Sequence, residues 1–280
     1  MDSIATLEQA VSTALAAPVA EAMHYVQRQP VRNADETGWY ERAKRLWLWI
    51  SATPLVTVFR LLTTRGAAGA KELLSADFPG VVGTDRYGAY SWVDPRQRQL
   101  CWAHLKREFM AWSERGGEVA QLGQALLAAE AQVFRLWYCV RDGTLSWADF
   151  QVAMLPVMAG VGTLLREGVV MAHKPTRRTC RNLVKLEAAL WTFVWEEGVE
   201  PTNNSAERPL RRAVLWRRRS FGTQSAAGSQ FVERILTAVT TLRQQQRDVL
   251  EYLTAACAAA TCGEPPPSLL ASGRPAPSAS

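Results

Sequence analysis

The stretch RLWLWISATPLVTVFRLL, residues 45–62, decides the fold class. It contains two runs rich in aromatic and β-branched side chains, residues 45–52 and 55–62, and Pro54 lies between them. Side chains of these types favour strands, and a proline between two such runs is typical of a turn. The stretch therefore predicts a pair of strands joined by a tight connection.

Predicted helices and strands alternate on both sides of this pair. In order they are a helix at 4–28, an extended segment at 30–40, the strand pair, a helix at 66–76, a strand in PGVVGTD at 79–85, a strand at 98–103 and a helix at 104–112. This order is typical of an α/β fold that starts with antiparallel strands.

The second half of the chain is expected to be mostly helical. Residues 117–200 are rich in Ala and Leu at helical period and indicate an insertion, and the helical signal resumes from 204 through 256. The segment from Gly263 is rich in Pro, Ser and Ala, so we expect it to be disordered. The predicted organisation is an N-terminal helix at 1–30, an α/β core in two parts at 31–116 and 201–258, a helical insertion at 117–200 and a disordered tail at 259–280.

Composition narrows the class of protein. The chain has 280 residues, 48% of them hydrophobic, which suffices for one large core or a core with an insertion. Its net charge of +6 suits a polyanionic partner. Five cysteines without a C-x-x-C pair argue against a disulfide framework and a structural zinc site. The longest apolar run, 46–59, is too short to span a membrane, so a cytoplasmic protein without a membrane partner is expected.

Three acidic residues are candidates for chemistry. Asp35 lies in NADETGW, Asp85 ends VVGTD, and Glu207 begins the last helical region. Carboxylates from distant positions can hold Mg²⁺ ions when the fold brings them together. The alternatives are a strand-end or turn role for each aspartate and, for Glu207, a capping box with Asn204 as the N-cap.

The segment PTNNSAERPLRRAVLWRRRSFGTQ, residues 201–224, places one acid before a cluster of arginines. A solvated basic face is the usual meaning of such a run. Arginines beside Trp and Phe also suit the binding of nucleic-acid phosphates. The DNA-binding candidates are Arg208, Arg211, Arg212, Arg217, Arg218 and Arg219.

Several blocks together resemble, in order, the catalytic core of the insertion-sequence 66 family of bacterial DDE transposases. They are NADETGW, VVGTDRYGAY, CWAHLKREF, PTNNSAERPLRRAVLWRRRSFGTQSAAGSQFVERILT and RQQQRDVLEYLTAA. The resemblance covers about residues 5–258 and is strongest over 201–256.

The resemblance implies an RNase H-like fold, with a mixed sheet flanked by helices and a helical insertion before the last acid. It implies that Asp35, Asp85 and Glu207 form the DDE triad, and it selects Asp35 over its neighbour Glu36. The implied cofactor is Mg²⁺, as two ions that Mn²⁺ is expected to replace. The implied reaction is strand cleavage at the ends of the element, followed by attack of the freed 3′-hydroxyl on target DNA, and the implied role of the arginines is contact with that DNA.

The resemblance also implies partners. These are the element ends and target DNA, further copies of the chain, and accessory proteins of the same element, in a bacterial cytoplasm where DNA holds the protein at the nucleoid. Full-length members carry an upstream zinc-binding and helix-turn-helix region that this chain is expected to lack, so a truncated copy is one interpretation. The alternatives are a catalytically inactive DNA-binding remnant and a nuclease relative that acts on RNA–DNA hybrids.

Overall fold

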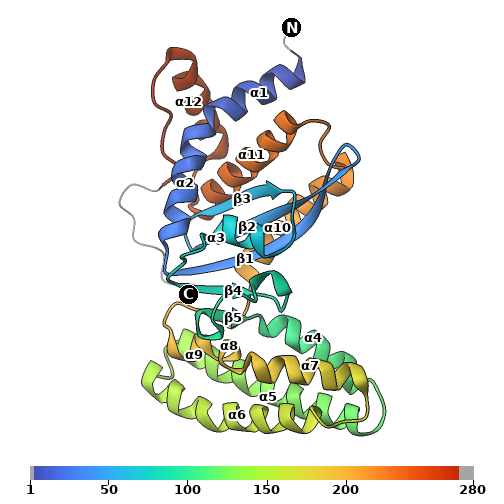
Figure 1. Ribbon diagram of the computed structural model, residues 1–280. Helices are drawn as coiled ribbons and strands as arrows, with labels where there is room; N and C mark the ends of the chain where they lie inside the picture. The colour runs from blue at the N-terminus through green and yellow to red at the C-terminus, as the bar shows by residue number, and fades with distance from the viewer. Residues whose placement is uncertain (1–2, 271–280) are drawn as a thin grey trace. The chain divides into compact units, whose positions relative to one another are not determined.

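The computed structural model describes residues 3–270 and divides them into two compact units (Figure 1). The first unit contains residues 3–92 and 203–270, and the second contains residues 93–202. Helices and strands occur together, as an α/β fold requires.

The first unit is built on a mixed sheet in which β1 is central. Its strands are β1 (Val31–Glu41), β2 (Lys44–Ala52), β3 (Thr57–Leu62) and β4 (Val81–Thr84), arranged in the order β3-β2-β1-β4. β2 pairs antiparallel with both β1 and β3, whereas β4 runs parallel to β1. The strand pair expected from residues 45–62 is therefore confirmed.

The described part of the first unit also contains six α-helices. They are α1 (Ile4–Ala14), α2 (Ala16–Arg28), α3 (Ala67–Leu74), α10 (Asn204–Ser220), α11 (Ala226–Gln244) and α12 (Val249–Cys262). A short 3₁₀ turn, η1 (Gly88–Tyr90), follows β4. The helix expected at 4–28 is interrupted at Leu15, and the helical stretch expected through 256 is divided between α11 and α12 near Gln246, which has a φ of 57°.

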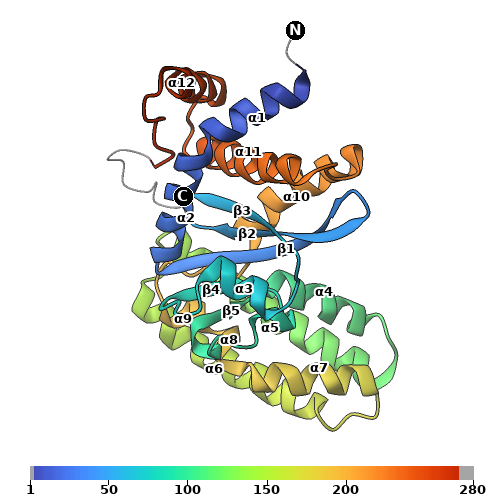
Figure 2. The same cartoon turned by 45° about the horizontal axis from the view of Figure 1, so that its top comes forward.

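The outer edge of β3 is covered by side chains of α11, which lies alongside it (Figure 2). The backbone N–H groups of Thr57 and Phe59 donate to the hydroxyls of Thr241 and Thr237 at 3.1 and 3.0 Å. An uncovered edge strand offers unpaired backbone groups to other chains. These threonines therefore close the sheet on that side.

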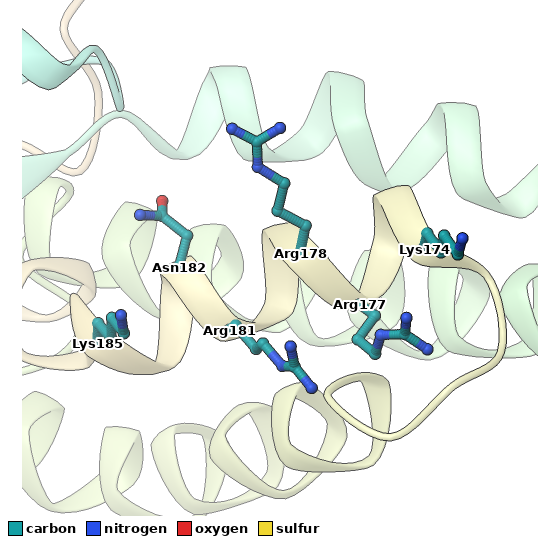
Figure 3. A pocket seen from close by; sticks show the side chains of 6 residues that line it. All are labelled: Lys174, Arg177, Arg178, Arg181, Asn182 and Lys185. Carbon is teal, nitrogen blue, oxygen red and sulfur yellow. The ribbon is translucent and has the colours of Figure 1, made fainter.

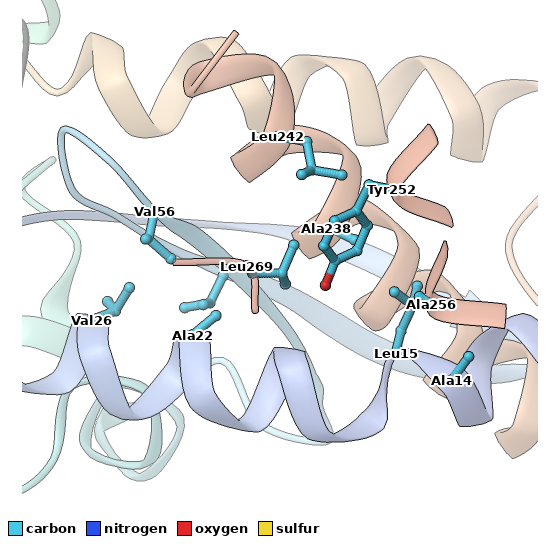
Figure 4. Close-up of a cluster of buried hydrophobic side chains, with 11 residues drawn as sticks. Ala14, Leu15, Ala22, Val26, Val56, Ala238, Leu242, Tyr252, Ala256 and Leu269 are labelled. Atoms are coloured by element: carbon cyan, nitrogen blue, oxygen red, sulfur yellow. The ribbon is translucent and has the colours of Figure 1, made fainter. Parts of the chain in front are cut away.

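The tail predicted to be disordered is partly ordered, so that prediction is wrong for residues 259–270. Residues 259–262 end α12, and the side chain of Leu269 is completely buried beside Val26, Val56 and Tyr252 (Figure 4). The side chains of Gln245 and Arg247 donate to its carbonyl oxygen at 2.9 and 3.3 Å. The Pro-rich composition predicted disorder, but the segment contains one leucine that the core buries. The prolines also reduce the conformational entropy that the unfolded chain loses on folding. The predicted tail at 271–280 lies outside the described residues.

The second unit is a helical assembly with one short strand. It contains η2 (Pro95–Gln97), β5 (Arg98–Leu100), α4 (Trp102–Ser113), α5 (Gly117–Arg141), α6 (Trp147–Gly168), α7 (Lys174–Lys185), α8 (Glu187–Leu190) and α9 (Thr192–Trp195). Trp137, Phe150 and Phe193 form an aromatic cluster in its core, with ring centroids 5.6–6.1 Å apart.

The helix α4 packs closely on α5 in the second unit. A Cβ atom added at Gly123 would lie 2.4 Å from the backbone nitrogen of Ser113 and 2.8 Å from the carbonyl oxygen of Phe109. The helix α6 is long and apolar enough to cross a membrane. The buried core helix of a soluble protein can have the same length and composition. Its side chains Phe150, Met154 and Leu165 are buried within this unit.

We predict that Leu269→Ala lowers the free energy of unfolding by about 2–5 kcal/mol, because it leaves a cavity in a closed apolar cluster. Urea denaturation followed by circular dichroism measures the change. The control is Leu250→Ala on α12, whose side chain is 74% exposed. Equal small effects from both substitutions would show that the segment after α12 is not part of the core.

Candidate active site

The pairing of β1 with β4 brings the two candidate aspartates together. Asn33 of β1 lies opposite Gly83 of β4, and Asp35 and Asp85 each follow two residues later on these parallel neighbours. Side chains two residues apart point to the same face of a sheet, and neighbouring strands lie about 4.8 Å apart. The register therefore places both carboxylates on one face at the end of β4.

Asn203 fixes the start of α10 against the same strand. Its side-chain amide donates to the carbonyl oxygen of Ala34 at 2.9 Å and accepts from the side chain of Asn33 at 2.9 Å, and Asn203 is completely buried. The Glu207 N–H donates to the Asn203 carbonyl at 3.1 Å. Glu207 is therefore held one helical turn from a contact with β1.

The pKa of Asp35 responds to the charges of the two other candidate acids. Burial, together with the negative charges of Glu36, Asp85 and Glu207, raises the pKa of Asp35 to about 7. A hydrogen bond of 2.8 Å from the Glu36 N–H to Asp35 Oδ1 acts in the opposite direction. The charges of Asp85 and Glu207 thus act on Asp35, although these residues are far apart in sequence.

Glu36, the competitor of Asp35, is bound by other side chains. Its carboxylate pairs with Arg65 Nε at 3.0 Å and accepts from the Tyr90 hydroxyl at 3.1 Å, and the side chain is 1% exposed. Burial raises the pKa of Glu36, as does the charge of Asp85, while Arg65 and Tyr90 lower it. The guanidinium of Arg65 also lies 4.0 Å from the centre of the Tyr87 ring. Glu36 therefore interacts with protein groups on the face of β1 opposite to Asp35.

Two of the alternative interpretations, the capping box at Glu207 and the strand-end or turn role of Asp35, are wrong. Asn204 is the first residue of α10, Asn203 is the N-cap, and no side chain caps this helix, so the capping box is absent. Asp35 lies inside β1 rather than in a turn. The turn interpretation of Asp85 is correct as geometry, because its Oδ1 accepts from the Tyr87 N–H at 2.8 Å.

Five of the six candidate arginines are exposed on α10, and one is not. The Nη1 atom of Arg217 donates to Thr37 Oγ1 at 3.1 Å and also to the Gly38 carbonyl, both on β1. Arg217 thus joins α10 to the central strand. The exposed arginines are Arg208, Arg211, Arg212, Arg218 and Arg219.

Sequence reasoning missed the residues that support the acids. Arg65 and Tyr90 hold Glu36, and Asn203 holds α10. The sequence gives only the positions of these residues and does not show what they contact. Asn203 stands four residues before Glu207, and Arg65 stands between β3 and α3, where sequence offers no partner for it.

The family model described as the IS66 family of transposases matches residues 2–231. The chain belongs to this family. An uncharacterized protein named y4qI from Sinorhizobium fredii (strain NBRC 101917 / NGR234) is 25% identical over 236 residues, covering 76% of this chain and 43% of that protein. The chain therefore spans less than half the length of that relative. No solved structure matches the chain.

We predict that Asn203→Ala lowers the free energy of unfolding by about 2–4 kcal/mol, because buried polar groups on β1 lose their partners. The neighbouring Asn204→Ala removes the same amide group from a half-buried position and is the matched control. Urea denaturation of both variants measures the difference. Equal losses would contradict the role assigned to Asn203.

We predict that Asp35→Asn stabilises the metal-free protein at about pH 8 by up to about 4 kcal/mol and has little effect near pH 4. The folded-state pKa, about 7, lies above the unfolded value, so the folded state binds more protons between these pH values. Wild-type stability therefore falls as pH rises through this window, and the asparagine removes that loss.

Denaturation in a chelator at several pH values measures this difference. Asp77→Asn, on the exposed surface of the same unit, is the control. A difference between wild type and Asp35→Asn that does not change with pH would contradict the assigned environment of Asp35.

Proposed function

We propose that the first unit is the catalytic core of a DDE-type transposase with an RNase H-like fold. The order β3-β2-β1-β4, with β4 alone parallel to β1 among these strands, supports that fold. Membership of the IS66 transposase family supports transposition as the process. The residues proposed to act are Asp35, Asp85 and Glu207.

The observation that carries the proposal is the high pKa of Asp35 beside Asp85 and Glu207. Like charges gathered in a buried place are unfavourable unless a cation or a proton compensates them. All three donors are carboxylate oxygens, the ligands that hard cations such as Mg²⁺ prefer. The chemistry of these donors therefore suits two Mg²⁺ ions, with Mn²⁺ as a substitute.

Divalent ions held here would neutralise the developing charge at the scissile phosphate and activate the attacking hydroxyl. The protein supplies rigid positions. Asp35 is fixed within β1, Asp85 is fixed by the Tyr87 N–H, and Glu207 is fixed through Asn203. Such positioning contributes much of the catalysis in an in-line phosphoryl displacement.

The exposed arginines on α10 would bind DNA phosphates beside this centre. Arg208, Arg211 and Arg212 follow Glu207 on the same helix, so backbone contacts would bring the phosphodiester toward the acids. The proposed substrates are the element ends and target DNA. Further copies of the chain and accessory proteins of the element are the proposed partners, at the bacterial nucleoid.

We predict that the purified chain nicks supercoiled plasmid when Mg²⁺ or Mn²⁺ is added, and that Asp85→Ala lowers the rate at least about 100-fold because a metal ligand is lost. Gel electrophoresis of plasmid topoisomers measures the rate. Asp77→Ala removes an exposed aspartate of the same unit and is the matched control. Folded, DNA-bound wild type that fails to nick would favour the alternative, a DNA-binding remnant without catalysis.

A further inference from the structure

The second unit carries a basic surface on α7 that the proposed chemistry does not use. Lys174, Arg177, Arg178, Arg181 and Lys185 line it together with Asn182. Figure 3 shows Lys174 and Lys185 at the two ends of the helix. In this view the Arg178 side chain extends above the helix axis, and those of Arg177 and Arg181 extend below it. We call these five cations the α7 basic surface.

Packing fixes which side of α7 faces outward. Thr176, Cys180 and Leu183 are buried, so the opposite side must face solvent. The exposed cations Lys174, Arg178, Arg181 and Lys185 follow one another at intervals of four, three and four residues. This spacing keeps side chains on one face of a helix.

The charge of the α7 basic surface is not neutralised by ion pairs. Among the residues that the structure describes, none of the five cations forms a salt bridge with a carboxylate. Two acids near the helix have other contacts, because Glu108 accepts from the Thr179 hydroxyl at 3.0 Å and Glu187 pairs with Arg166 at 2.8 Å. Arg177 donates to the Met171 carbonyl, which leaves its positive charge in place.

We propose that the α7 basic surface binds the phosphate backbone of duplex DNA, as a contact surface of the second unit. The choice of DNA as the polyanion rests on the proposed function. From Lys174 to Lys185 the helix rises about 16 Å. Each DNA strand carries one phosphate per about 3.4 Å of duplex axis, so a surface of this length can contact more than one phosphate.

A membrane surface fits these residues less well. Amphipathic helices that bind membranes present large apolar side chains to the lipid beside their basic face. The exposed side of α7 instead presents Asn182 among cations, and its apolar residues Cys180 and Leu183 are buried. Contacts to phosphates alone also carry no base readout, so binding by this surface is independent of sequence.

The test measures binding of the full chain to a short DNA duplex of arbitrary sequence by fluorescence anisotropy in a chelator, across a series of salt concentrations. Arg178→Gln combined with Arg181→Gln should reduce the slope of log K against log salt by about 1.8, since each phosphate contact contributes about 0.9. The control pair, Arg28→Gln with Arg135→Gln, removes the same charge from exposed positions on α2 and α5. It should leave the slope nearly unchanged.

Equal slopes for the two double variants would overturn the proposal. Tighter binding to vesicles of anionic lipid than to DNA would also overturn it. Because the assay contains no metal ion, it does not depend on catalysis. Loss of nicking in Asp85→Ala with an unchanged salt slope supports the active site, whereas a reduced slope in the α7 variant supports this surface even when no chain nicks.

Discussion

The amide of Asn203 is the contact on which the candidate site depends. It joins the start of α10 to β1 through hydrogen bonds between residues separated by 169 and 170 positions in the chain. A buried amide with partners on both its oxygen and its nitrogen specifies one position for the helix, because any shift would leave polar groups unpaired. Glu207 thus lies one helical turn from a contact with β1, although residues 93–202 separate it from Asp35 and Asp85 in sequence.

The backbone holds Asp35 rigidly in a place where burial and neighbouring negative charges disfavour its ionised form. Asp35 is held in the central strand with its pKa raised to about 7, and Glu36 beside it is bound by Arg65 and Tyr90. Neighbouring carboxylates on one strand are therefore given different roles by the faces on which they lie. One is compensated by protein groups, and the other is available to a proton or a cation.

Much of the fold could be predicted from sequence because its signals are local. The aromatic and β-branched runs at 45–62 gave the correct strands, and the apolar run ending at Asp85 gave β4. Non-local packing decided what sequence missed. Leu269 orders the segment after α12 because its side chain is buried in an apolar cluster, and Gly123 lets α4 approach α5 closely. The three acids were proposed from their positions and from the family resemblance, whereas Asn203, Arg65 and Tyr90 depend on contacts between distant segments that spacing does not encode.

The central claim is that Asp35, Asp85 and Glu207 together bind divalent cations. A crystal structure of the full chain grown with Mn²⁺, with anomalous scattering recorded at the manganese edge, tests this claim most directly. The account predicts one or two anomalous peaks about 2.2 Å from carboxylate oxygens of these residues. Ordered Mn²⁺ elsewhere with no peak among the three acids, or Asp35 engaged only in hydrogen bonds to its neighbours at neutral pH, would contradict it.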